Sequence, residues 1–163
     1  MNIRIRKDGY LVCNKLKIRC TFGKAGIQSQ KKEGDKTTPK GKFFIGKLYY
    51  RPDRIKNVKT FLKKKIIKKN TRWCNDINSK FYNREINFNS TIKAEKLFRK
   101  DYKYNLLAVI NYNIHPTIRG KGSAIFLHLT KNFKPTAGCV AIKINDFLKI
   151  LKVIKQNTKI LIG

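Results

Sequence analysis

Hydrophobic and polar residues alternate along several short segments of the N-terminal third of the chain. Segments 3–5 and 16–20 place apolar residues at every second position between basic ones, and 43–50 does so more loosely. Segment 10–12 is the returning strand after a turn at Asp8-Gly9. A period of two is typical of a strand with one face in a core and one face in solvent. We therefore predict a strand at each of these four places.

Two continuous apolar runs later in the chain have the length of buried strands. They read NLLAVINY at 105–112 and SAIFLHL at 123–129. Runs of this length favour strands rather than helices. The C-terminal end predicts a helix with Asn145 as its N-cap and an apolar stripe that begins at Phe147, followed by a strand at 158–162.

Helical periodicity is weaker elsewhere in the chain. In the basic segment 53–72, Val58, Leu62 and neighbouring apolar residues fit one face of a helix, and 94–99 fits a short helix. The glycine-rich polar segment 23–41 predicts a loop. Together the elements predict a mainly β fold, a mixed sheet or sandwich with a C-terminal helix and few short helices. A length of 163 residues predicts one domain covering 1–163.

The chain carries a large positive charge, with 39 lysines and arginines against 9 acidic residues and a net charge of +30. Such a balance is often found in proteins that bind nucleic acids or anionic surfaces. Lysine far outnumbers arginine, however, and the basic residues are spread along the chain without a recognition helix or an aromatic RNA-binding signature. We expect no specific nucleic-acid partner. We interpret 56–69 as a solvated basic surface that can attract anionic wall polymer.

From the residues given, we expect neither a membrane-spanning segment nor an apolar export signal. No apolar run approaches the roughly 18 residues of a membrane-spanning helix. Arg4, Arg6 and Lys7 interrupt the first residues, so an apolar signal-peptide core is not visible there. We expect no transmembrane segment, and we expect a monomer.

The spacing of cysteines and histidines does not predict a metal site. Cys13, Cys20, Cys74 and Cys139 form no Cys-x-x-Cys pair, and neither histidine completes a zinc-ligand spacing. We therefore expect no metal and treat the four cysteines individually.

One cysteine and one histidine stand in a context that suits nucleophilic catalysis. His128 ends an apolar run, and Cys139 begins another one 11 residues later, after a turn that contains Pro135. Two antiparallel strands joined in this way would bring a base close to a thiol. Gly138 permits an unusual backbone conformation beside an oxyanion site. The alternative is that Cys139 is a small buried hydrophobic residue and His128 a core histidine.

These residues resemble the catalytic motif of the L,D-transpeptidase family. In that family a strand ends in histidine, and a later Ser/Thr-His-Gly-Cys begins the next element. His128 matches the histidine, and Thr136, Gly138 and Cys139 match the Ser/Thr, Gly and Cys. The histidine that usually precedes Gly-Cys is Ala137 here. A second difference follows the motif, where Ala141 stands in place of a common Arg or Asn.

The resemblance covers most of the chain from about residue 23 onward. TTPKGKF at 37–43 is similar to the family's Thr-Pro-x-Gly-x-Phe loop and strand, and the predicted C-terminal helix and strand resemble its ending. A bacterial subgroup of the family is matched, in order, by Glu33-Gly34-Asp35, Trp73-Cys74, Tyr82-Asn83, 122–128 and 135–139. Several motifs in the expected order are far more specific than one motif alone.

The resemblance implies a cysteine enzyme that acts on peptidoglycan stem peptides without a metal or organic cofactor. A thioester acyl-enzyme passed to an amine gives a 3→3 cross-link, and passed to water gives L,D-carboxypeptidase or related amide hydrolase activity. A member that has lost catalysis would instead be a basic binding module for nucleic acid or wall polymer. Because peptidoglycan lies outside the cytoplasmic membrane, we expect the cell envelope or periplasm. Without a visible signal peptide, a cytoplasmic location stays open.

The resemblance also assigns roles to residues. Cys139 is the expected nucleophile, His128 the general base and acid, and Gly138 the residue that shapes the turn at the oxyanion site. Thr136 is expected either to bind substrate or to stabilise its own turn. Further residues expected to line the substrate pocket are Ser123, Tyr112, Asn113 and Trp73, of which Trp73 also suits a plain core position.

Overall fold

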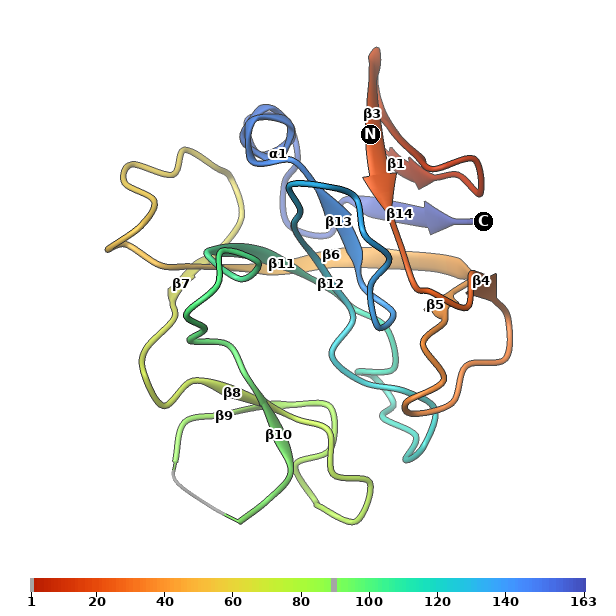
Figure 1. Ribbon diagram of the computed structural model, residues 1–163, viewed down its shortest axis with the longest axis vertical. Coiled ribbons are helices and arrows are strands. Elements are labelled where there is room, and N and C mark those ends of the chain that lie inside the picture. Colours follow the sequence, from red (N-terminus) through yellow and green to blue (C-terminus); the bar gives the residue numbers. More distant parts are fainter. Residues whose placement is uncertain (1, 89–90) are drawn as a thin grey trace.

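The computed structural model describes residues 2–88 and 91–163, which form a mainly β fold with one helix in the described part of the chain (Figure 1). The strands are β1 Asn2–Ile5, β2 Tyr10–Cys13, β3 Leu16–Thr21, β4 Ile27–Gln28, β5 Thr38–Pro39, β6 Gly41–Tyr50, β7 Lys64–Ile66, β8 Arg72–Cys74, β9 Glu85–Ile86, β10 Ala94–Lys96, β11 Leu106–Ile110, β12 Phe126–Leu129, β13 Val140–Ile142 and β14 Lys159–Ile162; the helix is α1 Ile144–Leu151. The predicted fold class, including the C-terminal helix, is confirmed.

The main sheet is mixed and closes on itself. Its nine strands follow the order β11-β12-β13-β3-β2-β1-β14-β6-β7, and β11 also pairs with β6. The long strand β6 makes this closure, because 41–44 pairs with β14 and 45–50 pairs with β11. In Figure 1, β6 runs across the middle of the molecule between these partners. The pairs β1–β14, β6–β7 and β12–β13 are parallel.

Two hydrophobic cores lie on opposite faces of β11 and β12. Side chains alternate between the faces of a strand. Leu106 and Ala108 therefore enter the main core with α1, while Leu107 and Val109 enter a second core that also contains Trp73 of β8. The second core lies between the main sheet and the small sheet β10-β8-β9. Burial of both faces explains why these two strands appear in the sequence as continuous apolar runs.

Two helices expected from the sequence are wrong. Segment 94–99 contains β10, which pairs antiparallel with β8 and places Glu95 opposite Trp73. In segment 58–66, Leu62 is buried but Phe61 is 72% exposed, and 64–66 forms β7 beside β6. Sheet pairing outweighs the weak helical periodicity in both places. Asn145 also does not cap α1, since the helix begins at Ile144 after an N-cap at Lys143 that makes no side-chain capping bond.

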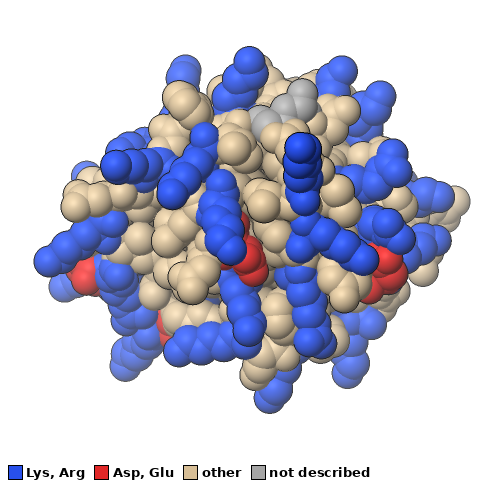
Figure 2. Space-filling view, turned by 90° about the horizontal axis from the view of Figure 1, so that it is seen from above, with Lys and Arg blue, Asp and Glu red and all other residues tan. Residues whose placement is uncertain are grey.

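On the face shown in Figure 2, the basic side chains are spread out rather than gathered in one groove. Figure 2 shows lysine and arginine side chains across the whole visible face, with acidic side chains visible at only a few points between them. Among the described residues, no helix has the length and apolar character needed to cross a membrane.

Candidate active site

His128 and Cys139 lie on the same face of neighbouring strands. β12 and β13 pair in parallel, with His128 opposite Ala141, so Cys139, which directly precedes β13, is one diagonal step from His128. The expected antiparallel hairpin is therefore wrong. The connection between the strands runs out to pair with the segment after β3, where the N–H of Thr136 donates to Phe22 O at 2.9 Å. The connection thereby returns the chain to the end of the sheet at which β12 begins, so that β13 can pair with β12 in parallel.

The turn before Cys139 needs both its threonine and its glycine. Thr136 Oγ1 accepts a hydrogen bond from Gly138 N at 3.1 Å and donates one to Cys139 O at 2.6 Å. Gly138 has φ of +144°, and a Cβ atom there would lie 2.8 Å from Thr37 O. A side chain at this position would meet a backbone that it cannot displace. Thr136 therefore stabilises the turn, which is one of its two expected roles.

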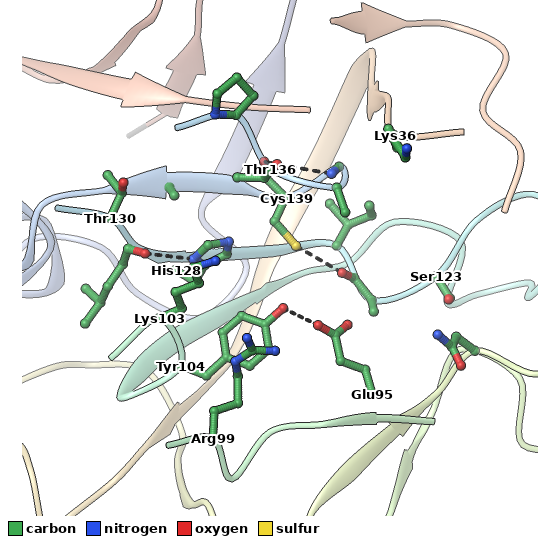
Figure 3. A pocket seen from close by; sticks show the side chains of 18 of the residues that line it. Lys36, Glu95, Arg99, Lys103, Tyr104, Ser123, His128, Thr130, Thr136 and Cys139 are labelled. Atoms are coloured by element: carbon green, nitrogen blue, oxygen red, sulfur yellow. Dashed lines mark hydrogen bonds between the residues drawn. The ribbon is translucent and has the colours of Figure 1, made fainter. Parts of the chain in front are cut away.

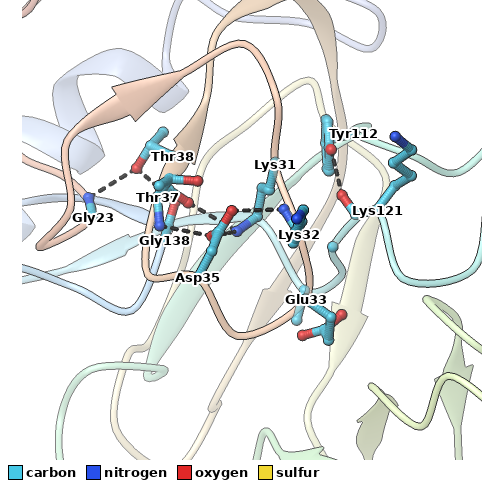
Figure 4. A network of polar contacts seen from close by, with 12 residues as sticks. Gly23, Lys31, Lys32, Glu33, Asp35, Thr37, Thr38, Tyr112, Lys121 and Gly138 are labelled. Atoms are coloured by element: carbon cyan, nitrogen blue, oxygen red, sulfur yellow. Dashed lines mark hydrogen bonds and ion pairs between the residues drawn. The ribbon is translucent and has the colours of Figure 1, made fainter.

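The Thr-Pro loop packs behind this turn (Figure 4). Thr38 Oγ1 donates a hydrogen bond to Gly138 O at 2.7 Å and accepts one from Gly23 N at 2.8 Å. The threonine is fully buried, so these bonds satisfy a hydroxyl that would otherwise be costly to bury. The loop motif recognised in the sequence is thus part of the support for the cysteine.

The Cys139 thiol is buried and hydrogen-bonded in this structure. Sγ donates to Ala124 O at 3.2 Å and accepts from Phe126 N at 3.3 Å. Burial, together with the nearby carboxyl of Glu95, raises the pKa of the thiol to about 12, although the Phe126 N–H and the Lys31 ammonium act in the opposite direction. The resting thiol is therefore neutral.

His128 is also buried and neutral. Burial, with smaller contributions from Lys103 and Arg99, lowers the pKa of the imidazole to about 4. Nδ1 lies 3.0 Å from Leu129 O. Since a carbonyl only accepts hydrogen bonds, Nδ1 carries the proton of the neutral ring, and Nε2 remains unprotonated as a potential base. A neutral thiol and a neutral imidazole thus face the same space.

That space is an open pocket of about 910 Å³ lined by both residues (Figure 3). Tyr104 contributes one wall, with its ring centroid 5.2 Å from that of His128 and its hydroxyl hydrogen-bonded to Glu95. The walls carry charges of both signs. The charged side chains lining the pocket are Lys31, Glu33, Lys36, Lys93, Glu95, Arg99, Lys103 and Lys134. The pocket therefore suits an extended ligand that carries both ammonium and carboxylate groups.

The other expected pocket residues divide into two groups. Thr136 and Ser123 line the pocket, whereas Trp73, Tyr112 and Asn113 lie outside its lining. Trp73 belongs to the second core, Tyr112 donates its hydroxyl to Lys121 O, and the Asn113 amide bridges Ile118 and Gly122 in the loop before β12. Within 2–88 and 91–163, no group of three or more His, Cys, Asp or Glu side chains is arranged to hold a metal.

Sequence reasoning recognised Asn83 as part of a motif but gave it no role. Its buried side chain accepts hydrogen bonds from Trp73 Nε1 at 2.9 Å and Ala124 N at 3.1 Å. Its amide donates to the carbonyls of Tyr112 at 3.0 Å and Asn113 at 2.7 Å. Asn83 therefore links the second core to the segment whose Ala124 carbonyl holds the Cys139 thiol.

Replacing Asn83 with alanine is expected to lower the free energy of unfolding by about 3 kcal/mol, because it leaves several buried donors and acceptors without partners. Urea denaturation followed by tryptophan fluorescence measures this change. The matched control is the exposed Asn78→Ala, which should change stability by less than about 0.5 kcal/mol. Equal stabilities of the two variants would contradict the role given to Asn83.

The comparison with known families decides which family this arrangement represents. The sequence model of the L,D-transpeptidase catalytic domain family, YkuD, matches residues 4–162. The chain belongs to this family. The match includes all of β2 to β14 and therefore both strands of the candidate site.

Solved structures agree with this fold. Bd1075 from Bdellovibrio bacteriovorus is similar with a TM-score of 0.51 and 16% identity, covering 99% of this L,D-transpeptidase domain and 47% of that chain. Pgp2 from Campylobacter jejuni, described as a helical cell shape determining protein, is similar with a TM-score of 0.51 and 15% identity, covering 99% and 46%. The chain thus spans about half the length of either protein. No curated protein sequence matches it.

Proposed function

We propose that this L,D-transpeptidase domain is an active cysteine acyltransferase that forms a thioester with a peptidoglycan stem peptide and passes the acyl group to an amine. The observation that supports this most strongly is the placement of His128 and Cys139 on one face of adjacent strands, lining one pocket. The assignment to the L,D-transpeptidase family supports the proposed class of chemistry and substrate.

The first half-reaction forms the thioester. Cys139 Sγ turns from Ala124 O toward the pocket and attacks the carbonyl carbon of the scissile amide, while its proton passes to Nε2 of His128. Since both groups are neutral before substrate arrives, proton transfer accompanies the attack. The amide of Gly138 already donates to Thr136, so we assign the oxyanion to the N–H of Cys139. The C–N bond then breaks, and the leaving D-alanine amine takes the proton from His128.

The second half-reaction reverses these roles. An amine of another stem peptide loses a proton to His128 and attacks the thioester, and Cys139 leaves as a thiolate that recovers the proton. Water in place of the amine would give carboxypeptidase activity with the same residues. Because the substrate is a wall polymer, we propose a location in the cell envelope, which fractionation of cells followed by immunoblotting would test.

Incubating the reduced protein with a disaccharide-tetrapeptide is expected to release D-alanine and to add the mass of the acyl group to Cys139. A carbapenem, whose strained carbonyl replaces the scissile amide, should label the same cysteine. Intact-mass spectrometry and peptide mapping measure both adducts, and a second stem peptide distinguishes cross-linking from hydrolysis. A folded protein that gives neither adduct nor D-alanine would reject the enzyme proposal and favour a basic wall-binding module.

A further inference from the structure

A buried lysine lies beside the turn that carries Cys139. The Lys31 side chain is 4% exposed, and Nζ donates to Asp35 Oδ1 at 2.7 Å and to Thr37 O at 2.9 Å (Figure 4). Lysine is rarely buried, since removing an ammonium from water costs several kcal/mol even when it is paired. The sequence places Lys31 in a polar, glycine-rich loop, where a solvated lysine would be expected.

Two glycines lie against this side chain, and Gly122 makes room for it. A Cβ atom at Gly122 would lie 2.7 Å from Lys31 Cε, and one at Gly138 would lie 3.5 Å from Nζ. The methylenes therefore pass closely against Gly122, and the ammonium ends beside the residue that precedes Cys139. Lys31 also lines the same pocket as Cys139 and His128.

The turn between Lys32 and Thr37 is held by hydrogen bonds from backbone N–H groups and does not require the Lys31 ammonium. Asp35 already accepts backbone hydrogen bonds from Lys32 N at 2.6 Å and Thr37 N at 2.9 Å. The chain segment that carries the cysteine contributes no charge of its own, because Ala137 and Gly138 precede Cys139 and the apolar residues of 140–142 follow it. Of the three Nζ hydrogens, Asp35 and Thr37 occupy two, and the third has no partner among the described residues.

We propose that Lys31 is a positioning residue for the nucleophile, whose buried ammonium favours the negative charge that develops on Cys139 Sγ when the thiol loses its proton. The inference rests on the proposed function in that Cys139 is the nucleophile. An ammonium fixed by Asp35 and Thr37 is itself buried, and charges interact more strongly in a buried environment than at the surface.

Charged and hydrogen-bonding groups from several elements act on the thiol together with Lys31. Glu95 of β10 opposes the thiolate, whereas Lys31, the Phe126 N–H and the Tyr104 hydroxyl favour it. His128 faces the same pocket as a neutral base. The counter-charge Asp35 stays ionised near neutral pH, because the hydrogen bonds from Lys31, Lys32 and Thr37 outweigh its burial and lower its pKa to about 2.

Alkylation by iodoacetamide tests the proposal without any wall substrate. The double variant Lys31→Met, Asp35→Asn removes the ion pair while leaving the net charge of the chain unchanged. We expect the peptide containing Cys139 to be alkylated about tenfold more slowly at pH 8, corresponding to a shift of about one pKa unit, with the pH profile displaced upward. The control Lys15→Met, at an exposed residue outside the pocket, should leave the profile unchanged.

The single variant Asp35→Asn provides a result of opposite sign. Removing the counter-charge leaves the ammonium less neutralised, so Cys139 should be alkylated faster than in the wild type and its pH profile should shift downward. A folded double variant with the wild-type profile overturns the proposal, as does a folded Asp35→Asn variant that reacts more slowly. If neither variant folds, Lys31 is purely structural and the proposal is rejected. A wild-type protein without transpeptidase activity leaves this comparison valid.

Discussion

Replacing Cys139 with alanine is expected to abolish D-alanine release and every covalent adduct with a stem peptide or a carbapenem. The thioester needs the sulfur atom, and no other thiol lines the pocket in the described part of the chain. The variant should still fold, because alanine fills a similar space and only the hydrogen bonds to Ala124 and Phe126 are lost. Intact-mass spectrometry and circular dichroism measure the two effects separately.

The other cysteines are matched controls for this experiment. Cys13, Cys20 and Cys74 are buried at 4% exposure or less, away from the pocket lining. Replacing each with serine buries a hydroxyl and should lower stability by about 1–3 kcal/mol, but turnover by the folded fraction should remain close to that of the wild type. Loss of the adduct in a folded Cys20→Ser protein, with retention in Cys139→Ala, would mean that the nucleophile is assigned to the wrong residue.

The strands were predictable because burial leaves a direct trace in the sequence. β1 and β3 have one buried face and therefore alternate, whereas β11 and β12 are buried on both faces and therefore appear as continuous apolar runs. Segment 94–99 was misassigned because nothing local indicates that Glu95 will pair opposite Trp73. Strand propensity depends on such partners more than helix propensity does.

The site was predictable in its motif but not in its surroundings. The turn from Thr136 to Cys139 and its Thr38 support could be matched to a family pattern, because each residue type is required by backbone geometry. The parallel pairing of β12 with β13 could not be foreseen, since it depends on contacts between Thr136 and Phe22, which lie far apart in sequence. The same holds for Glu95, whose approach to the thiol comes entirely from tertiary packing.

Replacing His128 with asparagine is expected to slow acylation of Cys139 by about 10²–10⁴-fold, the usual contribution of a general base. Asparagine places an N–H near the position of Nδ1, so the hydrogen bond to Leu129 O is retained while the basic Nε2 is lost. Carbapenem labelling followed over time by mass spectrometry measures the rate. The Cys139 thiol is neutral at pH 7, so the variant should recover part of its rate as hydroxide increases at higher pH.

The pH dependence of stability, compared with the acylation rate, distinguishes a catalytic base from a histidine that is only structural. Burial lowers the pKa of His128 from 6.5 to about 4. Between these two pH values the histidine is protonated in the unfolded chain but neutral in the folded chain, so the folded state loses stability as the pH falls. The wild type should lose about 3 kcal/mol of stability across this window as the pH falls, and His128→Asn should lose less. A variant with the flatter stability profile but undiminished acylation would show that His128 is buried as described and is not the base.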